Sequence, residues 1–131
     1  MDIKIVSTPL ADIYKLVYSK FLDKRGTFQR LFCNFQLEQL KFSIKQINLS
    51  KNKKPNTFRG FHYQSKYKEK KIVKVLKGSL IFYAINIDKS SKEYSKSFKL
   101  KINENSNFAL YISDKFATAY FTTEPNTQIL Y

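Results

Sequence analysis

The feature that most constrains the fold of this chain is a series of short segments in which apolar and polar residues alternate with a period of two. The clearest is SFKLKIN, residues 97–103. Its Phe98, Leu100 and Ile102 would face one way and the lysines between them the other. Such alternation is typical of a β-strand with one face in a core and the other in water. It predicts strands rather than helices.

Other segments have the same strand-like composition and are separated by turn residues. They are IYKLVYSKF (13–21), TFQRLFCNF (27–35), KFSIKQINLS (41–50), RGFHYQ (59–64), NFALYIS (107–113), ATAYFTT (117–123) and TQILY (127–131). KIVKVLKGSLIFYAINID (71–88) predicts two strands joined by a short hairpin-like turn at Lys77-Gly78-Ser79. Only FQLEQLKF (35–42) has the pattern of a helical turn. Many short strands with closely spaced turns predict an all-β sandwich or jelly roll.

The length of 131 residues predicts one domain, residues 1–131, with one core. No apolar run approaches the roughly 20 residues of a membrane helix, and MDIKIVSTPL lacks the long apolar segment of a signal peptide. The single cysteine, Cys33, excludes an internal disulfide and is interpreted as a small buried hydrophobe. We therefore expect a cytoplasmic protein without a membrane partner.

The formal charge of +14 indicates an anionic partner. Three interpretations are a nucleic acid, a small phosphorylated ligand, and a lysine-rich surface that is merely solvated. The lysines are scattered over KNKK (51–54), KYKEKK (66–71) and KSSKEYSKSFKLK (89–101) rather than gathered on one helical face. The aromatic residues do not form a recognisable signature for binding single strands. We therefore expect no nucleic-acid partner.

The only histidine, His62, lies in RGFHYQ, and histidine is the side chain that most easily moves a proton near neutral pH. Strict alternation would place Arg59, Phe61 and Tyr63 on one face of this strand and Gly60, His62 and Gln64 on the other, and would gather Gln46, Asn48 and Ser50 on one face of theirs. Polar side chains that face a core are costly unless they are satisfied or used. The pattern predicts either a functional concave face, with Lys71 nearby, or an exposed face.

Six segments occur in an order and at spacings typical of one family. They are DKRGTF (23–28), QINLS (46–50), RGFHYQ (59–64), KIVKVLKGSL (71–80), INIDKSSKEY (85–94) and LYISDKFATAYF (110–121). In these the sequence resembles the dTDP-4-dehydrorhamnose 3,5-epimerases of the cupin superfamily. The resemblance implies a cupin-type jelly roll, a homodimer, and a nucleotide-diphosphate 4-keto-6-deoxy sugar as substrate.

The resemblance also implies roles for individual residues. It matches His62 to the general base, Lys71 (or its neighbour Lys70) to the lysine that stabilises the enolate oxygen, Arg25 and Arg59 to diphosphate-binding arginines, and Gln46 and Asn48 to residues lining the nucleotide and sugar site. The chemistry suits these residue types, because an α-proton of a ketone needs a base paired with positive charge at the oxyanion. No cofactor is implied, and one histidine argues against a metal-binding cupin.

The sequence departs from the family pattern at several site positions. The family's catalytic tyrosine and the carboxylate that orients its histidine are expected beyond Tyr131. The family's GFAHGF reads KFATAYF, so that Thr118 replaces a histidine; Arg30 replaces a glutamate and Phe82 an inward aspartate. A substitute for the missing acid would be Tyr63, Tyr120, Tyr131 or water.

Several functional hypotheses follow from these matches and departures. One is an epimerase-like isomerase of bacterial surface-polysaccharide (lipopolysaccharide) synthesis. Another is a catalytically degenerate relative that binds a nucleotide sugar, and a third is a truncated epimerase. A dTDP-sugar ketoisomerase is a further alternative, although those short cupins carry two histidines as RGxHxH and Gln64 stands at the second.

Overall fold

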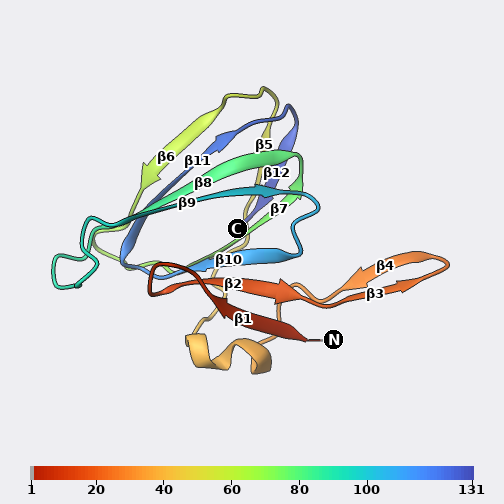
Figure 1. Ribbon diagram of the computed structural model, residues 1–131, viewed down its shortest axis with the longest axis horizontal. Helices are drawn as coiled ribbons and strands as arrows, with labels where there is room; N and C mark the ends of the chain where they lie inside the picture. Colours follow the sequence, from red (N-terminus) through yellow and green to blue (C-terminus); the bar gives the residue numbers. More distant parts are fainter. Residues whose placement is uncertain (1) are drawn as a thin grey trace.

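The computed structural model describes residues 2–131 and consists mainly of antiparallel β-strands (Figure 1). The elements are β1 (Ile3–Ser7), β2 (Ile13–Tyr18), β3 (Lys20–Asp23), β4 (Gly26–Gln29), the 3-10 helix η1 (Phe35–Leu40), β5 (Leu49–Asn52), β6 (Phe58–His62), β7 (Lys71–Lys77), β8 (Ser79–Asn86), β9 (Ser97–Asn103), β10 (Phe108–Ile112), β11 (Phe116–Thr122) and β12 (Thr127–Leu130). This confirms the all-β prediction.

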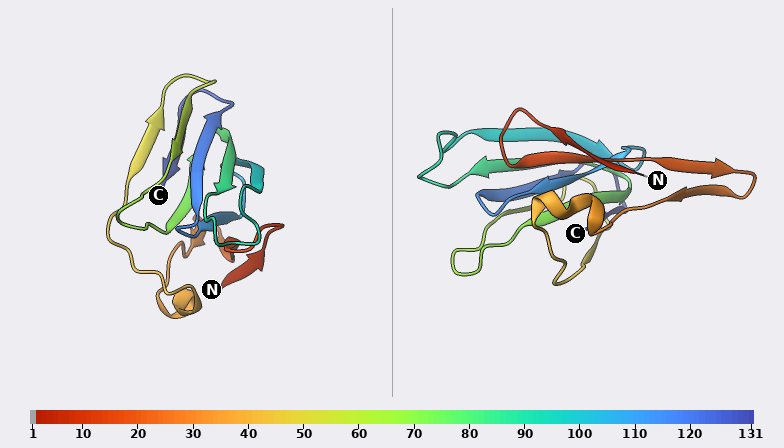
Figure 2. Two further views of the ribbon diagram at one scale, coloured as in Figure 1. Left: turned by 90° about the vertical axis from the view of Figure 1, so that its left-hand side faces the viewer. Right: turned by 90° about the horizontal axis from the view of Figure 1, so that it is seen from below.

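Ten of the strands form two sheets that face each other (Figures 1 and 2). The six-stranded sheet has the order β1-β2-β10-β7-β12-β5, and the four-stranded sheet has the order β6-β11-β8-β9. Consecutive strands β5 and β6 are therefore edge strands of different sheets. β3 and β4 form a separate two-stranded hairpin. The predicted β-sandwich is confirmed.

The turn at Gly78 is not the hairpin that the sequence predicts. β7 pairs with β10 and β12, whereas β8 pairs with β9 and β11, so the turn passes from one sheet to the other. Gly78 has φ +79°, and a Cβ atom there would collide with the side chain and Cα of Thr127. The hairpin prediction is wrong because a glycine turn between two strand patterns does not reveal whether the strands pair with each other.

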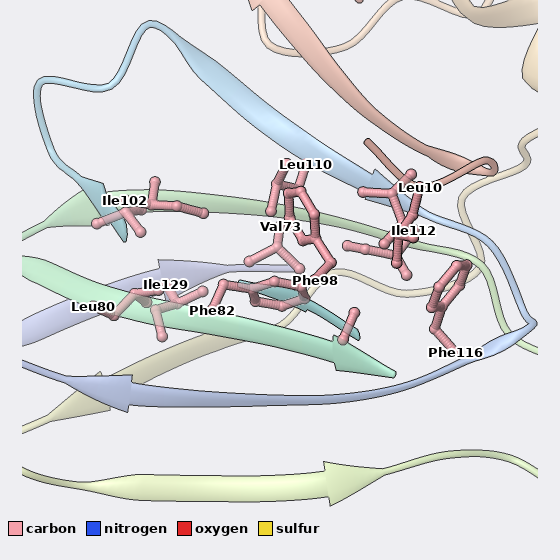
Figure 3. Packing of buried hydrophobic residues seen from close by; sticks show 13 residues of the cluster. Leu10, Val73, Leu80, Phe82, Phe98, Ile102, Leu110, Ile112, Phe116 and Ile129 are labelled. Atoms are coloured by element: carbon pink, nitrogen blue, oxygen red, sulfur yellow. The ribbon is translucent and has the colours of Figure 1, made fainter. Parts of the chain in front are cut away.

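The core between the sheets is built from inward-facing side chains. Phe98 and Ile102 are buried while Lys99 and Lys101 are exposed, which confirms the alternation predicted for β9. Figure 3 shows the buried cluster, which comprises Leu10, Ile13, Val73, Val75, Leu80, Phe82, Ala84, Phe98, Ile102, Leu110, Ile112, Phe116 and Ile129. The strands that line the site are thus fixed by apolar packing.

A second apolar cluster covers the outer face of the six-stranded sheet. Leu37 and Leu40 of η1 pack there with Leu16 and Tyr111, and the helical turn predicted around residues 35–42 is confirmed. Burial raises the pKa of Tyr111 to about 12. Among the described residues, no helix is long and apolar enough to cross a membrane.

The segment 41–50, predicted as one alternating strand, is mostly irregular. Lys41 ends η1 in the left-handed conformation, and only β5 from Leu49 onward is a strand. The backbone of Asn48 exchanges two hydrogen bonds with that of Tyr131. Phe42 packs against the outer cluster instead of facing the core between the sheets. Of the apolar positions that suggested a strand here, only Phe42 packs in the outer cluster, whereas Ile44 and Ile47 are 40% and 64% exposed.

The hairpin β3–β4 projects away from the two sheets (Figures 1 and 2), and we call it the arm. Three large apolar side chains on it are exposed: Phe21 by 56%, Leu22 by 74% and Phe28 by 61%. Near its tip, Asp23 accepts hydrogen bonds from the side chain and backbone of Arg25, which hold the pKa of that carboxyl below its usual range. The arm therefore exposes apolar surface with a cation at its end.

The inter-sheet turn gives a first prediction. Gly78→Ala should lower the free energy of unfolding by about 2 kcal/mol or more, because positive φ and collision with Thr127 both oppose a methyl group there. Gly26→Ala is the matched control, since Gly26 in the arm also has positive φ (+133°) but a methyl group on it would meet nothing within 4 Å. Urea unfolding monitored by circular dichroism measures both. Equal losses in the two variants would contradict the steric role of Thr127.

Candidate active site

A cavity of about 400 Å³ lies between the sheets where β6 and β11 approach β5, β7 and β12. We call it the His62 cavity. It is lined by Ser50, Arg59, His62, Gln64, Lys71, Val73, Phe82, Thr118, Ala119, Tyr120, Ile129 and Tyr131. Of the residues predicted for the site, His62, Arg59 and Lys71 are brought together here.

Arg59 and His62 face the same cavity because β6 contains a bulge. His62 pairs with Thr118 of β11 and Arg59 pairs with Tyr120, so three steps along β6 match two steps along β11. The extra residue reverses the side on which the strand's side chains emerge. The prediction that Arg59 and His62 lie on opposite faces is therefore wrong, since strict alternation does not hold through a bulge.

Two further observations define this bulge. Phe58 and Phe61 are both about half exposed, and their ring centroids lie 6.1 Å apart, so they share the outer face of β6. A Cβ atom on Gly60, which has φ +131°, would lie 2.5 Å from the Cβ of Ala119. Glycine thus lets β6 approach β11 closely at the point where the bulge turns Arg59 inward.

A connected set of hydrogen bonds surrounds Asn52, whose side chain is buried. Its Oδ1 accepts from Nε of Arg59 at 3.0 Å and from the hydroxyl of Tyr120 at 3.3 Å. That hydroxyl lies 3.0 Å from Oγ of Ser50, and Nδ2 of Asn52 donates to the same Oγ at 3.4 Å and to the carbonyl of Thr127 at 3.2 Å. We call Ser50, Asn52 and Tyr120 the polar ring. Sequence reasoning missed Asn52, although it lies two positions after Ser50 and so on the same face of β5.

The two neighbouring lysines before and in β7 have different surroundings. Lys71 lines the His62 cavity, and its ammonium lies 3.8 Å from the carboxylate of Glu69, at the long end of ion-pair distances. The ammonium of Lys70 instead donates to the carbonyls of Leu40 and Lys41, both at 3.2 Å, where η1 ends. The geometry favours Lys71 over Lys70 as the cation of the cavity.

Gln46 and Asn48 do not line the His62 cavity. They line a smaller cavity of about 130 Å³ on the outer side of the six-stranded sheet, with Phe32, Phe42 and Ile44 among its apolar walls. Lys71 and Tyr131 line both cavities, so the two adjoin. The structure therefore keeps Gln46 and Asn48 near the predicted site but not inside it.

Arg25 lies apart from the other predicted site residues. It belongs to the arm, its side chain is 89% exposed, and its guanidinium is paired with Asp23. Within this chain it lies with Phe21 and Phe28 on the surface of the arm. It is not brought to the His62 cavity within one copy of the chain.

The lining of the His62 cavity carries cationic side chains but no acidic ones, and part of its wall is apolar. Arg59 and Lys71 are cationic, and none of the twelve lining residues is acidic. The wall formed by Val73, Phe82 and Ile129 is apolar. Within residues 2–131, no group of three or more histidine, cysteine, aspartate and glutamate side chains is arranged to hold a metal ion. Such a cavity can hold an anion beside an imidazole and an apolar surface.

Comparison with known proteins agrees with this architecture. The sequence profile of dTDP-4-dehydrorhamnose 3,5-epimerase matches residues 7–131. The chain is 27% identical over 131 residues to the epimerase of Shigella flexneri, covering 97% of this chain and 72% of that protein. It is 26% identical to the epimerase of Neisseria gonorrhoeae over 97% of this chain but only 39% of that protein.

Solved structures give the same result. The epimerase of Sulfolobus tokodaii superposes with a TM-score of 0.89 at 28% identity, over 100% of this chain and 74% of that one. That of Bacillus anthracis gives 0.90 at 25% identity, over 98% and 75%. The fold is therefore the cupin-type jelly roll expected from the resemblance. The chain belongs to the dTDP-4-dehydrorhamnose 3,5-epimerase family.

The contrast between the lysines gives a second prediction. Lys71→Met should weaken binding of inorganic pyrophosphate about tenfold, because it removes a cation from the cavity. Lys70→Met is the matched control and should leave that affinity unchanged while lowering stability by about 1 kcal/mol, since it removes hydrogen bonds to the end of η1. Isothermal titration and urea unfolding measure the two effects. Equal loss of affinity in both variants would contradict this assignment.

Proposed function

We propose that this protein is an epimerase-like isomerase of a dTDP-linked 4-keto-6-deoxy sugar, with His62 as the base. The observation that carries the proposal is the meeting of His62, Arg59 and Lys71 in one cavity without an acidic lining residue. The family supports it: the Bacillus anthracis relative was solved with TDP and PPi bound. A nucleotide-diphosphate sugar is an anion, and an anionic partner is what the formal charge of +14 indicated.

The proposed first step is removal of a proton from the carbon next to the 4-keto group. The imidazole of His62 takes the proton, and the carbonyl oxygen becomes an enolate oxygen. Lys71 stabilises that charge, which lowers the barrier because the ammonium is already in place in a part-buried site. Arg59 binds the diphosphate and holds the sugar in position.

Epimerisation also needs a proton donor on the other side of the sugar ring, and we propose Tyr131. Among the tyrosines that could serve, Tyr63 is not a lining residue and Tyr120 is held in the polar ring. Tyr131 lines the His62 cavity, as Lys71 does, and is 43% exposed.

The remaining predicted residues fit a ligand longer than the His62 cavity. Gln46 and Asn48 line the adjoining cavity, which shares Lys71 and Tyr131 with the first. We propose that the sugar occupies the His62 cavity and that Gln46 and Asn48 contact the nucleotide or the outer part of the sugar. Side-chain amides can donate and accept in such contacts.

We further propose a cytoplasmic homodimer that acts in surface-polysaccharide synthesis. The exposed Phe21, Leu22 and Phe28 of the arm provide apolar surface that a second copy would cover. In that arrangement the arm would carry Arg25 toward the partner's site, where it would meet the diphosphate. We also propose that residues 1–131 form a single domain.

The second candidate function is binding of the nucleotide sugar without turnover. It is favoured by the surroundings of His62, where Thr118 is its strand partner and no carboxylate lines the cavity to orient the ring. A base that lacks an orienting partner works less well but is not thereby inactive. A ketoisomerase, which moves the keto group instead of inverting a carbon, would use the same base.

Solvent exchange provides the third prediction. In deuterated buffer, the protein should replace the protons at C3 or C5 of dTDP-4-keto-6-deoxyglucose above the enzyme-free rate, as measured by proton NMR. His62→Asn should lose this exchange by a factor of about 100 or more, because the base is removed, while ligand line-broadening persists. Exchange in the variant equal to that of the wild type would rule out His62 as the base.

The same spectra separate the candidate functions. Line-broadening without exchange in the wild-type protein identifies a binding protein. Exchange at C3 without change at C5, together with a moved keto group in the product, identifies a ketoisomerase. Absence of both broadening and exchange contradicts the proposed ligand.

The arm gives the fourth prediction. Phe21→Ser combined with Phe28→Ser should convert a dimer to a monomer in sedimentation velocity, because paired aromatic side chains supply much of an interface's apolar area. Lys24→Ser at the arm's tip is the matched control and should remain dimeric. A wild-type monomer at micromolar concentration would contradict the proposed arrangement.

A further inference from the structure

We propose that Asn52 is a positioning residue whose polar ring, completed by Ser50 and Tyr120, holds Arg59 ready to bind the diphosphate. The inference rests on the proposed function, since it concerns how the proposed ligand is held. Asn52 and Tyr120 were not assigned this task by the sequence patterns. The proposed positioning role is based on the geometry of the hydrogen bonds that converge on the buried side chain of Asn52.

The donor and the acceptor of each hydrogen bond in the polar ring can be assigned. The side chain of Asn52 has one acceptor atom, Oδ1. It accepts hydrogen bonds from both Nε of Arg59 and the hydroxyl of Tyr120. Since the Tyr120 hydroxyl has one proton and gives it to Asn52, the contact between Tyr120 and Ser50 must have Ser50 as its donor. Ser50 in turn accepts from Nδ2 of Asn52. The ring is therefore closed.

The ring fixes how Arg59 can act. Its Nε is used by Asn52, which leaves the two terminal nitrogens of the guanidinium as donors for a ligand. These nitrogens form a planar fork that suits two oxygens of a phosphate. Because one end of the guanidinium is already anchored, less side-chain freedom is lost when a ligand binds.

The choice of an amide rather than a carboxylate matters for charge. Asn52 anchors Arg59 without neutralising it, and none of the ion pairs found among the described residues includes Arg59. An aspartate at position 52 would keep an acceptor for Nε but would compete with the diphosphate for the cation. The amide thus preserves the positive charge that the cavity offers to an anion.

The ring also links the two sheets. Ser50 and Asn52 belong to β5 at the edge of the six-stranded sheet, whereas Arg59 and Tyr120 belong to β6 and β11 of the four-stranded sheet. Asn52 is 2% exposed and also donates to the carbonyl of Thr127 on β12. A side chain anchored to both sheets holds Arg59 against a rigid support.

The test is a thermodynamic cycle on binding of dTDP, measured by isothermal titration. Asn52→Ala should weaken binding about tenfold, the effect of losing a charged hydrogen bond that orients the cation. In an Arg59→Ala background the same change should have almost no effect, because the residue it positions is gone. A residue with a merely structural role would reduce affinity equally in both backgrounds.

Two further variants sharpen the cycle. Asn52→Asp should also weaken binding about tenfold, and the affinity should depend less on salt because one cation is neutralised. Tyr120→Phe should weaken binding about threefold while solvent exchange into the sugar persists, since Tyr120 positions Arg59 and does not donate the proton. Tyr120→Phe removes a single hydroxyl, so it keeps the test decisive if Asn52→Ala fails to fold.

Asn86→Ala is the matched control for burial. Asn86 is 3% exposed, donates to Oγ of Ser91 and accepts from the backbone of Asp88, and it does not line the His62 cavity. Its loss should lower thermal stability and leave dTDP affinity unchanged. A fall in affinity equal to that of Asn52→Ala would overturn the positioning role.

A readout without ligand separates this inference from the proposed function. The Nε–H signal of Arg59 in a proton–nitrogen NMR spectrum should be protected from exchange in the wild type and lost in Asn52→Ala. If Arg59→Ala weakens dTDP binding while Asn52→Ala and the Nε–H signal are unaffected, the inference fails and the proposed diphosphate site stands. If the signal behaves as expected and Arg59→Ala leaves dTDP affinity unchanged, the diphosphate role and the positioning proposed for it both fail.

Discussion

The close contact of Gly60 with Ala119 is the constraint on which the site depends. It lets β6 lie against β11 with an extra residue, so that Arg59 and His62 emerge on the same side. In a regular strand, residues three apart face opposite ways. One of these two side chains would then lie in solvent beside Phe58 and Phe61, and the cavity would lose either its imidazole or its guanidinium. A local irregularity of the backbone thus brings the two side chains together.

The cavity shows how a charged site is accommodated in a small sandwich. Arg59 lies on the edge strand β6, and Lys71 begins the inner strand β7 with its side chain 22% exposed, while Val73, Phe82 and Ile129 belong to the core. A cation is costly to bury without a partner, but one that stays partly exposed retains some water until a ligand arrives. The absence of an acidic lining residue then favours an anion over a cation as the occupant.

The sequence predicts the fold better than it predicts the placement of individual side chains. The alternation of apolar and polar residues in β9 predicts that one face of the strand is buried. The burial of Phe98 and Ile102 follows directly from that pattern. The bulge in β6 and the passage of Gly78 between sheets depend on which strands become neighbours, which no local pattern contains. Alternation places Asn52 on the same face as Ser50, but its converging contacts from β6, β11 and β12 are contained in no local pattern.

The two tyrosines of the cavity illustrate why a site is assigned from hydrogen bonds rather than from residue type. Both Tyr120 and Tyr131 line it, and either phenol could in principle supply a proton. The hydroxyl of Tyr120 is within hydrogen-bond distance of Ser50 and Asn52, so giving its proton to a sugar would remove one hydrogen bond of the ring that we propose holds Arg59 for the diphosphate. Tyr131 stands outside that ring. Positioning and proton transfer are therefore best served by different tyrosines, and the one within the ring is suited to positioning.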